Sequence, residues 1–161
     1  MILGLTFMSK VSAKHILGLL AKRHCDDVFI PECKNGPTWR KVSRGQITYR
    51  MDAWVLKRSW AQPCTTGYEI KVSRSDFLQD KKWKKYLPLC NKFFFVCPDD
   101  TIIRKDELPK YVGLIYLTKD CTSLRAVKRA VYRDVVLPDN LWRYIVMCRS
   151  EISNTYSKRR R

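Results

Sequence analysis

The sequence is short of acidic residues: 15 Asp and Glu stand against 32 Lys and Arg, a formal net charge of +17 over 161 residues. This excess makes a polyanion the expected partner, and nucleic acid fits better than a membrane surface. No apolar run approaches the roughly 18 residues of a membrane-spanning helix. The apolar residues 1–7 lack a basic leader and a cleavage site, so we do not expect a signal peptide. Charge that serves solubility alone is the weaker alternative, because solubility needs far less charge.

Paired cysteines are also absent. The chain has seven cysteines, an odd number, and no C-x-x-C pair. Scattered thiols in apolar segments are typical of a reduced protein, so we predict a cytoplasmic location and no disulfide framework. A zinc site formed by His24, Cys25 and Cys33 is a minor alternative, because the paired ligand spacing of such sites is missing.

The length and the 45% hydrophobic content predict one domain with a substantial core, residues 1–156, followed by a basic tail, residues 157–161. Local patterns predict a helix that starts after Ser9 or Ser12 and ends near His24, and strands at 28–33, 47–56, 92–97 and 113–118. Further helices are predicted at 74–87, ending at Pro88, and at 139–153, with Leu141, Trp142, Ile145, Val146 and Cys148 facing inward. The segment 124–132 is compatible with either a strand or a helix.

The strongest pattern lies in residues 67–86, which read GYEIKVSRSDFLQDKKWKKY. Apolar side chains at positions 68, 70 and 72 alternate with Glu69 and Lys71, which places an acid and an amine on one face of a short strand. Ser73 and Asp76 then form an S-x-x-D capping box that ends the strand and opens a helix. This arrangement favours chemistry on an anion, because a helix N-terminus carries partial positive charge.

Acid-x-base pairs are expected by chance in so charged a chain: the composition predicts roughly three. Three are present, at Glu32/Lys34, Glu69/Lys71 and Asp80/Lys82. Glu69/Lys71 differs from the other two because it lies on an apolar strand. The preceding strand, 47–56, carries Asp52 in an otherwise apolar run, where an unpaired carboxylate is costly. We therefore expect Asp52 and Glu69 to lie on neighbouring strands and to share a divalent cation. A solvated Asp and Glu–Lys pair is the structural alternative.

Two segments, RMDAW and GYEIKVSRSDFLQDKKWKKYLPLCNKFFFVCP, resemble the MmcB-like branch of the PD-(D/E)XK nuclease superfamily. The resemblance spans about residues 25–118 and implies a restriction-endonuclease-like α/β core, αβββαβ, with a mixed central sheet flanked by helices. It assigns Asp52, Glu69 and Lys71 to the catalytic Asp and E-x-K positions. Lys82 and Tyr86 fall where related nucleases place a Gln and a Tyr, so Lys82 departs from the pattern.

The resemblance implies an endodeoxyribonuclease that depends on Mg²⁺ or Mn²⁺, with a role in DNA repair or in phage or mobile-element DNA processing. The expected metal ligands are Asp52, Glu69, the carbonyl of Ile70 and Glu32, since hard cations prefer oxygen. A surface glutamate paired with Lys34 is the alternative for Glu32. Lys71 is expected to orient the attacking water or to offset negative charge. A homodimer is a further expectation if both strands of a duplex are cut.

Aromatic and basic residues suggest where the nucleic acid lies. The loop at 35–45 carries Trp39, Arg40, Lys41 and Arg44, a combination that suits base stacking and phosphate contact. A tryptophan folded onto the core is an equal alternative for Trp39. We expect further contacts at Arg74 and Lys82, near the active edge. Two other functions remain open: a non-catalytic nucleic-acid-binding module that uses the same basic surface, and a factor that binds an acidic protein.

Overall fold

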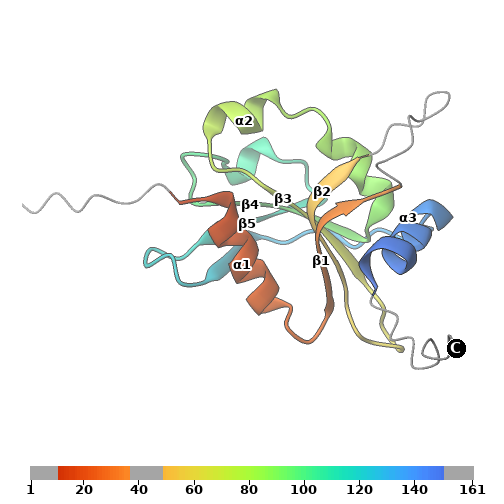
Figure 1. The fold of residues 1–161 in the computed structure, drawn as a ribbon. Helices are drawn as coiled ribbons and strands as arrows, with labels where there is room; N and C mark the ends of the chain where they lie inside the picture. The colour runs from red at the N-terminus through yellow and green to blue at the C-terminus, as the bar shows by residue number, and fades with distance from the viewer. Residues whose placement is uncertain (1–10, 37–48, 151–161) are drawn as a thin grey trace, which may run out of the picture.

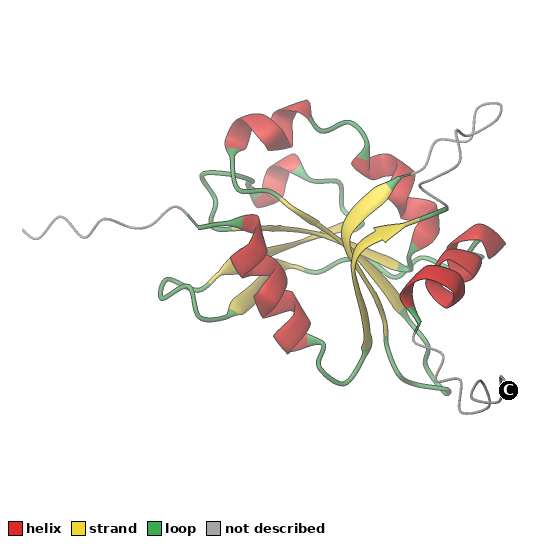
Figure 2. Ribbon diagram, viewed as in Figure 1, coloured by secondary structure: helices red, strands yellow, loops and turns green. Residues whose placement is uncertain are grey.

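The computed structural model describes residues 11–36 and 49–150, and its centre is one six-stranded mixed sheet (Figure 1). The sheet order follows the sequence: β1 (Val28–Lys34), β2 (Arg50–Leu56), β3 (Thr65–Ile70), β4 (Lys92–Cys97), β5 (Val112–Leu117) and β6 (Leu124–Lys128). The pairs β1–β2, β2–β3 and β5–β6 are antiparallel, whereas β3–β4 and β4–β5 are parallel. The predicted α/β class, with a mixed sheet flanked by helices, is therefore confirmed (Figure 2).

One face of the sheet is covered by α1 (Ala13–Arg23), as the N-terminal pattern predicts. Ser12 caps this helix, and its Oγ accepts a hydrogen bond from the His15 amide at 3.2 Å. Ile16 and Leu20 are fully buried one turn apart and pack in the same cluster as Tyr68 and Ile70 of β3. This packing leaves the alternate residues of β3, including Glu69, on the other face.

The opposite face packs against α2 (Arg74–Gln79), the 3₁₀ segment η1 (Trp83–Leu89) and α3 (Asp139–Tyr144). Its core is largely aromatic: Trp83 stacks on Phe93, and Phe93 meets Phe95 edge-on. The Trp54 indole is also fully buried here, and its Nε1 donates to the Leu89 carbonyl at 2.8 Å. A short 3₁₀ turn, η2 (Lys105–Glu107), precedes β5.

The single helix predicted over 74–87 is wrong in its middle. Helix α2 ends at Gln79, and Asp80 has an extended backbone with φ −76° and ψ 104°. The Asp80 carboxylate causes the break, since its Oδ1 accepts hydrogen bonds from the amides of Lys82 and Trp83, at 2.8 and 3.3 Å, and starts η1. Pro88 lies inside η1 and does not end it.

The C-terminal helix also differs from the prediction. It begins at Asp139 as expected, but after Tyr144 it widens into a π-helical segment, η3 (Ile145–Arg149). The wider turn rotates the following side chains off the predicted face, so Val146 and Cys148 are exposed and their inward assignment is wrong. The inward assignment of Trp142, which precedes this turn, is also wrong, because its side chain is exposed. Leu141 is buried as predicted, and Tyr144 takes the second inward position.

The segment at 124–132, which the sequence left open, forms the edge strand β6 over its first part. All seven cysteines lie among the described residues and carry free thiols. No helix in the described ranges has both the length and the apolar character needed to cross a membrane.

Candidate active site

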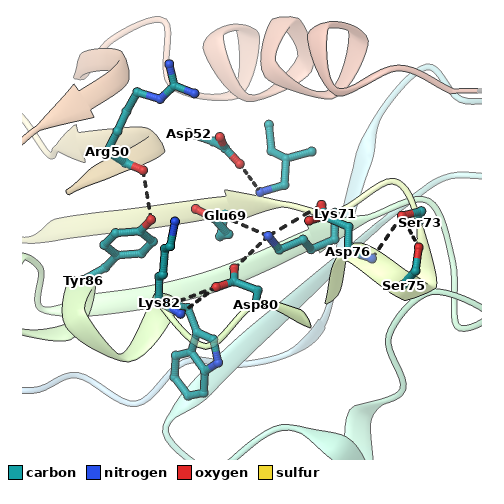
Figure 3. Close-up of polar contacts among 12 residues, drawn as sticks. Arg50, Asp52, Glu69, Lys71, Ser73, Ser75, Asp76, Asp80, Lys82 and Tyr86 are labelled. Carbon is teal, nitrogen blue, oxygen red and sulfur yellow. Dashed lines mark hydrogen bonds and ion pairs between the residues drawn. The ribbon is translucent and has the colours of Figure 1, made fainter. Parts of the chain in front are cut away.

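Asp52, Glu69 and Lys71 all line one cavity of ≈ 560 Å³, beside the C-terminal end of β3 (Figure 3). The last paired residues of the β2–β3 ladder are Ala53 and Tyr68, so Asp52 and Glu69 lie where the two strands stop pairing. There the Asp52 carboxylate replaces a ladder partner: its Oδ2 accepts a hydrogen bond from the Ile70 amide at 2.7 Å. The predicted juxtaposition of Asp52 with the Glu69–Lys71 pair is therefore present.

Lys71 lies at the centre of the acidic side chains. Its side chain is only 6% exposed, and its Nζ lies 3.1 Å from Glu69 Oε1. The same nitrogen forms an ion pair with Asp80 Oδ2 at 2.7 Å and lies 3.7 Å from Asp76 Oδ2. One buried ammonium is thus surrounded by three carboxylates.

Asp76 and Asp80 were not predicted as site residues. The capping box is half confirmed, because Ser73 Oγ accepts from the Asp76 amide at 3.2 Å while the Asp76 carboxylate turns towards Lys71. Asp80 belongs to an acid-x-base pair that the sequence could not separate from chance. It reaches Lys71 because the chain breaks between α2 and η1 at this residue.

Burial and neighbouring charges shift the pKa values of the acidic groups and of Lys71 in this cavity. Burial, followed by the charge of Asp52, raises the pKa of Glu69 to about 8. Burial also raises the pKa of Asp52, although the hydrogen bond from the Ile70 amide partly offsets it. Burial alone would raise the pKa of Asp80, but its contacts with Lys71 and the Lys82 amide outweigh burial and lower it. For Lys71 burial acts in the lowering direction, and the surrounding carboxylates reverse it to a raised pKa.

Glu69 Oε2 is buried and has no hydrogen-bond partner among the described residues. A buried carboxylate oxygen without a donor is costly, and a divalent cation shared with Asp52 would satisfy it. Oxygen ligands of this kind suit Mg²⁺ or Mn²⁺. Within residues 11–36 and 49–150, no three His, Cys, Asp or Glu side chains gather in the arrangement of a metal site. Asp52 and Glu69 would therefore hold the ion together with water or substrate oxygens. Mg²⁺ usually keeps several such ligands when it binds to one or two carboxylates.

Two further metal ligands were predicted, the Ile70 carbonyl and Glu32, and neither residue lines the cavity. Ile70 contributes its amide to Asp52. Glu32 has a left-handed backbone, φ 49°, and its side chain is 62% exposed, with Oε1 3.6 Å from Arg50 Nη1. Glu32 does not line the cavity, whereas Arg50 does.

The predicted nucleic-acid contacts divide into three groups. Lys82 lines the cavity. The Arg74 guanidinium forms a two-point ion pair with Glu107 and donates to the Ile102 carbonyl at 2.9 Å, away from the cavity. Trp39, Arg40, Lys41 and Arg44 lie outside the described residues.

A basic rim surrounds the carboxylates. The cations that line the cavity besides Lys71 are Arg50, Lys81, Lys82 and Lys85. The Lys85 ammonium lies over the Tyr49 ring, 5.2 Å from its centroid, and Tyr86 Oη donates to the Arg50 carbonyl at 3.0 Å. The sequence did not predict Arg50, Lys81 and Lys85 as members of this rim. For the two lysines the reason is that a run of lysines in a predicted helix normally faces solvent, whereas Arg50 lies on β2.

No protein-family model and no curated protein matches this sequence. Among solved structures, the SPO1766 protein of unknown function from Silicibacter pomeroyi is similar, with a TM-score of 0.57 and 22% identity. The alignment covers 83% of this chain and 78% of that chain. At this identity the similarity establishes a shared fold and leaves the chemistry to be argued from the cavity.

Proposed function

We propose that this chain is a divalent-metal-dependent nuclease that hydrolyses DNA phosphodiester bonds, with the restriction-endonuclease-like core of the PD-(D/E)XK superfamily and its MmcB-like branch. The observation that carries the proposal is the buried Glu69 oxygen without a partner, in a cavity that also holds Asp52 and Lys71. The strand directions support it as well: three antiparallel strands followed by a parallel pair match the expected αβββαβ arrangement.

Each group has a role that its position supports. The rim cations, Arg50, Lys81, Lys82 and Lys85, bind the phosphates on both sides of the scissile bond. Asp52 and Glu69 hold Mg²⁺ or Mn²⁺, which when bound polarises a phosphoryl oxygen and lowers the pKa of water. The Lys71 ammonium offsets the negative charge that develops on the phosphate during attack.

Asp80 is a positioning residue for Lys71. Because the lysine pKa is raised in this setting, Lys71 acts here as a fixed cation and not as a general base. Asp80 keeps it in place from the side opposite the strand, and the Asp80 carboxylate is itself fixed by the amides that open η1.

A nuclease assay at fixed salt tests the proposal. Wild type, Glu69→Gln and the exposed-acid control Asp106→Asn would be compared on single-stranded, duplex, nicked and branched DNA and on RNA. Each substrate would be incubated with Mg²⁺, Mn²⁺, Ca²⁺ or EDTA. We expect cleavage that needs Mg²⁺ or Mn²⁺, is kept by Asp106→Asn and is lost by Glu69→Gln. Cleavage that persists in Glu69→Gln, or in EDTA, would contradict the assignment.

A second candidate function is a non-catalytic nucleic-acid-binding module. It is favoured by one observation: the described residues bring only two carboxylates to the expected metal position, and Lys71 already neutralises one of them. Such a module would bind nucleic acid equally well in EDTA and as Glu69→Gln, and would cut none of the substrates. Sedimentation with and without a DNA duplex would show whether a second copy joins the complex.

A further inference from the structure

A second cavity, of ≈ 570 Å³, lies at the opposite end of β3. It is lined by Thr66, near the start of the strand, and by His24, which caps the C-terminus of α1. The catalytic candidates Glu69 and Lys71 lie at the other end of the same strand and do not line it. Any ligand of this cavity therefore belongs to a site separate from the proposed active site.

One wall of the cavity is the β2–β3 loop, residues 57–64, and this loop is well braced. The Lys57 amide donates to the Cys64 carbonyl at 2.9 Å, which closes the loop at its base. Within the loop, the Gln62 amide donates to Ser59 Oγ at 3.1 Å. The residues that line the cavity from this loop include Ala61, Gln62, Pro63 and Cys64.

A chain of polar contacts ties this loop to the core. The Arg58 amide donates to Asp27 Oδ1 at 3.2 Å, and Asp27 Oδ2 lies 2.8 Å from His24 Nδ1. The other ring nitrogen of His24 lies 2.7 Å from the buried Tyr68 hydroxyl. Both carboxylate oxygens of Asp27 are thus occupied by donors from the protein, and the proposed mechanism uses none of these groups.

The braced loop holds an aromatic side chain in water. Trp60 is fully exposed, and Tyr132, which lines the cavity, is half exposed. Lys57 and Lys92 line the cavity together with Tyr132, and Arg58 is exposed on the same loop as Trp60. Exposed aromatic rings beside cations are the combination that binds single-stranded nucleic acid, because every base offers a face for stacking and every phosphate a negative charge.

We propose that this cavity and the 57–64 loop bind a single-stranded nucleic acid segment. One nucleotide occupies the cavity beside Tyr132, Trp60 stacks on a neighbouring base, and Lys57 and Lys92 contact phosphates. The two exposed rings favour a nucleic acid over an acidic protein, which supplies negative charge but no bases for stacking. The one acid of the cavity is already bound within the protein, and two separate rings match successive bases better than they match a lipid interface. The inference goes beyond the proposed nuclease and does not depend on cleavage.

The test is a binding measurement in EDTA, where cleavage does not interfere. A labelled single-stranded oligonucleotide of about 15 nucleotides is titrated by fluorescence anisotropy, since one binding fold covers about 4–16 nucleotides. We expect Trp60→Ala with Tyr132→Ala to weaken binding at least about tenfold, and Trp60→Phe, which keeps a ring, to weaken it less than about threefold. Melting curves confirm that each variant is folded.

A matched pair of charge variants completes the test. Lys57→Gln is expected to reduce the slope of log affinity against log salt by about 0.7, the value for one phosphate contact on a single strand. Lys119→Gln, an exposed lysine on the β5–β6 turn, is expected to leave the slope unchanged. Binding by the double alanine variant within about twofold of wild type, or equal slopes for the two lysine variants, would overturn the proposal. So would an equal dependence on Trp60 for a duplex of the same length.

The two proposals fail separately. Glu69→Gln is expected to bind the oligonucleotide as wild type does in EDTA. If cleavage proves independent of Glu69 while binding still needs Trp60, the nuclease assignment falls and the second site remains.

Discussion

Both ends of β3 carry buried polar groups, but the hydrogen bonds of these groups are fully satisfied only at the start of the strand. At the start of the strand, the buried Thr65 and Asn91 satisfy each other: Asn91 Oδ1 accepts from the Thr65 amide at 2.8 Å and from its hydroxyl at 2.9 Å. Thr65 Oγ1 in turn accepts from the Asn91 amide at 2.9 Å. At the far end, burial and like charge raise the pKa values of Asp52 and Glu69, and one Glu69 oxygen has no partner.

We infer from this difference that the groups at the start of the strand stabilise the fold, whereas those at its far end are available to a ligand. In a closed network such as Thr65–Asn91, the polar groups satisfy one another's hydrogen bonds and need no ligand. This network also fixes the register of β3 against the start of β4. An open network costs stability in the isolated chain, and a ligand that completes it recovers that cost on binding. The four predictions below follow from this contrast, and each perturbs the polar groups at one end of β3.

The largest effect is expected at the open end. Glu69→Gln keeps the shape of the side chain but removes its charge, so we expect nuclease activity to fall at least about 100-fold. At neutral pH the wild type has to protonate Glu69 when it folds, a cost that the neutral variant lacks, so the variant should melt at the same temperature as wild type in EDTA or at a higher one. Steady-state cleavage rates and melting curves check both statements. A variant that loses activity only because it unfolds would contradict this reading.

At the start of β3 we expect the opposite result, a loss of stability without a loss of activity. Asn91→Ala leaves the Thr65 amide and hydroxyl without their acceptor, which should cost roughly 2–3 kcal/mol of unfolding free energy, or about 4–12 °C in melting temperature. At a temperature where the variant is folded, its cleavage rate should match that of wild type. Denaturant unfolding and low-temperature assays measure the two effects. A rate loss as large as that of Glu69→Gln would remove the distinction between the two ends.

Asp80 joins both kinds of network, so its two functions can be separated. Asp80→Asn keeps an oxygen for the Lys82 and Trp83 amides but removes the charge that faces Lys71. We expect kcat to fall about tenfold with KM unchanged, because only the transition-state charge is affected. Both variants remove a buried partner of Lys71 and should be less stable than wild type. Asp80→Ala should show the same loss of kcat and be about 1 kcal/mol less stable than Asp80→Asn, since the cap is lost too. Equal stabilities for the two variants would argue against the capping role.

The smallest effect expected is a pH dependence of stability. In EDTA the folded chain binds a proton at Glu69 up to about pH 8, above the ordinary value of 4.5. The native state therefore holds more protons than the unfolded state in this window, and stability should fall as the pH rises from about 4.5 to 8. We expect a decrease in melting temperature across this range that Glu69→Gln abolishes and Ca²⁺ partly reverses at pH 8. Parallel melting curves for the two proteins across this range would contradict the assignment.

Period-two alternation was sufficient to predict which residues of β3 face α1 and which face the cavity. Because an alternating strand has only two faces, Glu69 and Lys71 could be placed together from the sequence, and the apolar run around Asp52 indicated a neighbouring strand. β4 was predicted on a different ground, its continuous apolar run, and β1 and β5 were predicted as short apolar segments.

Asp80 could not be predicted, because its position depends on a break in a segment with good helix-forming residues. The Asp80 carboxylate competes with the helix for backbone amides and accepts those of Lys82 and Trp83. Trp83 in turn packs on Phe93 and Phe95, and these long-range contacts are not visible in the local sequence pattern. The same applies to η3, where the widened turn follows from tertiary packing and not from the sequence period.

The ion pair between Lys71 and Asp80 also limits which substitutions evolution can tolerate at these two positions. Each side chain is at most 7% exposed, so loss of Lys71 would leave the Asp80 carboxylate buried without its cation, and loss of Asp80 would remove one of the carboxylates that hold the Lys71 charge. A viable lineage would have to alter positions 71 and 80 in concert, or retain both. In relatives of this chain we therefore expect the two positions to covary, so that an alignment would reveal their contact without any knowledge of the fold.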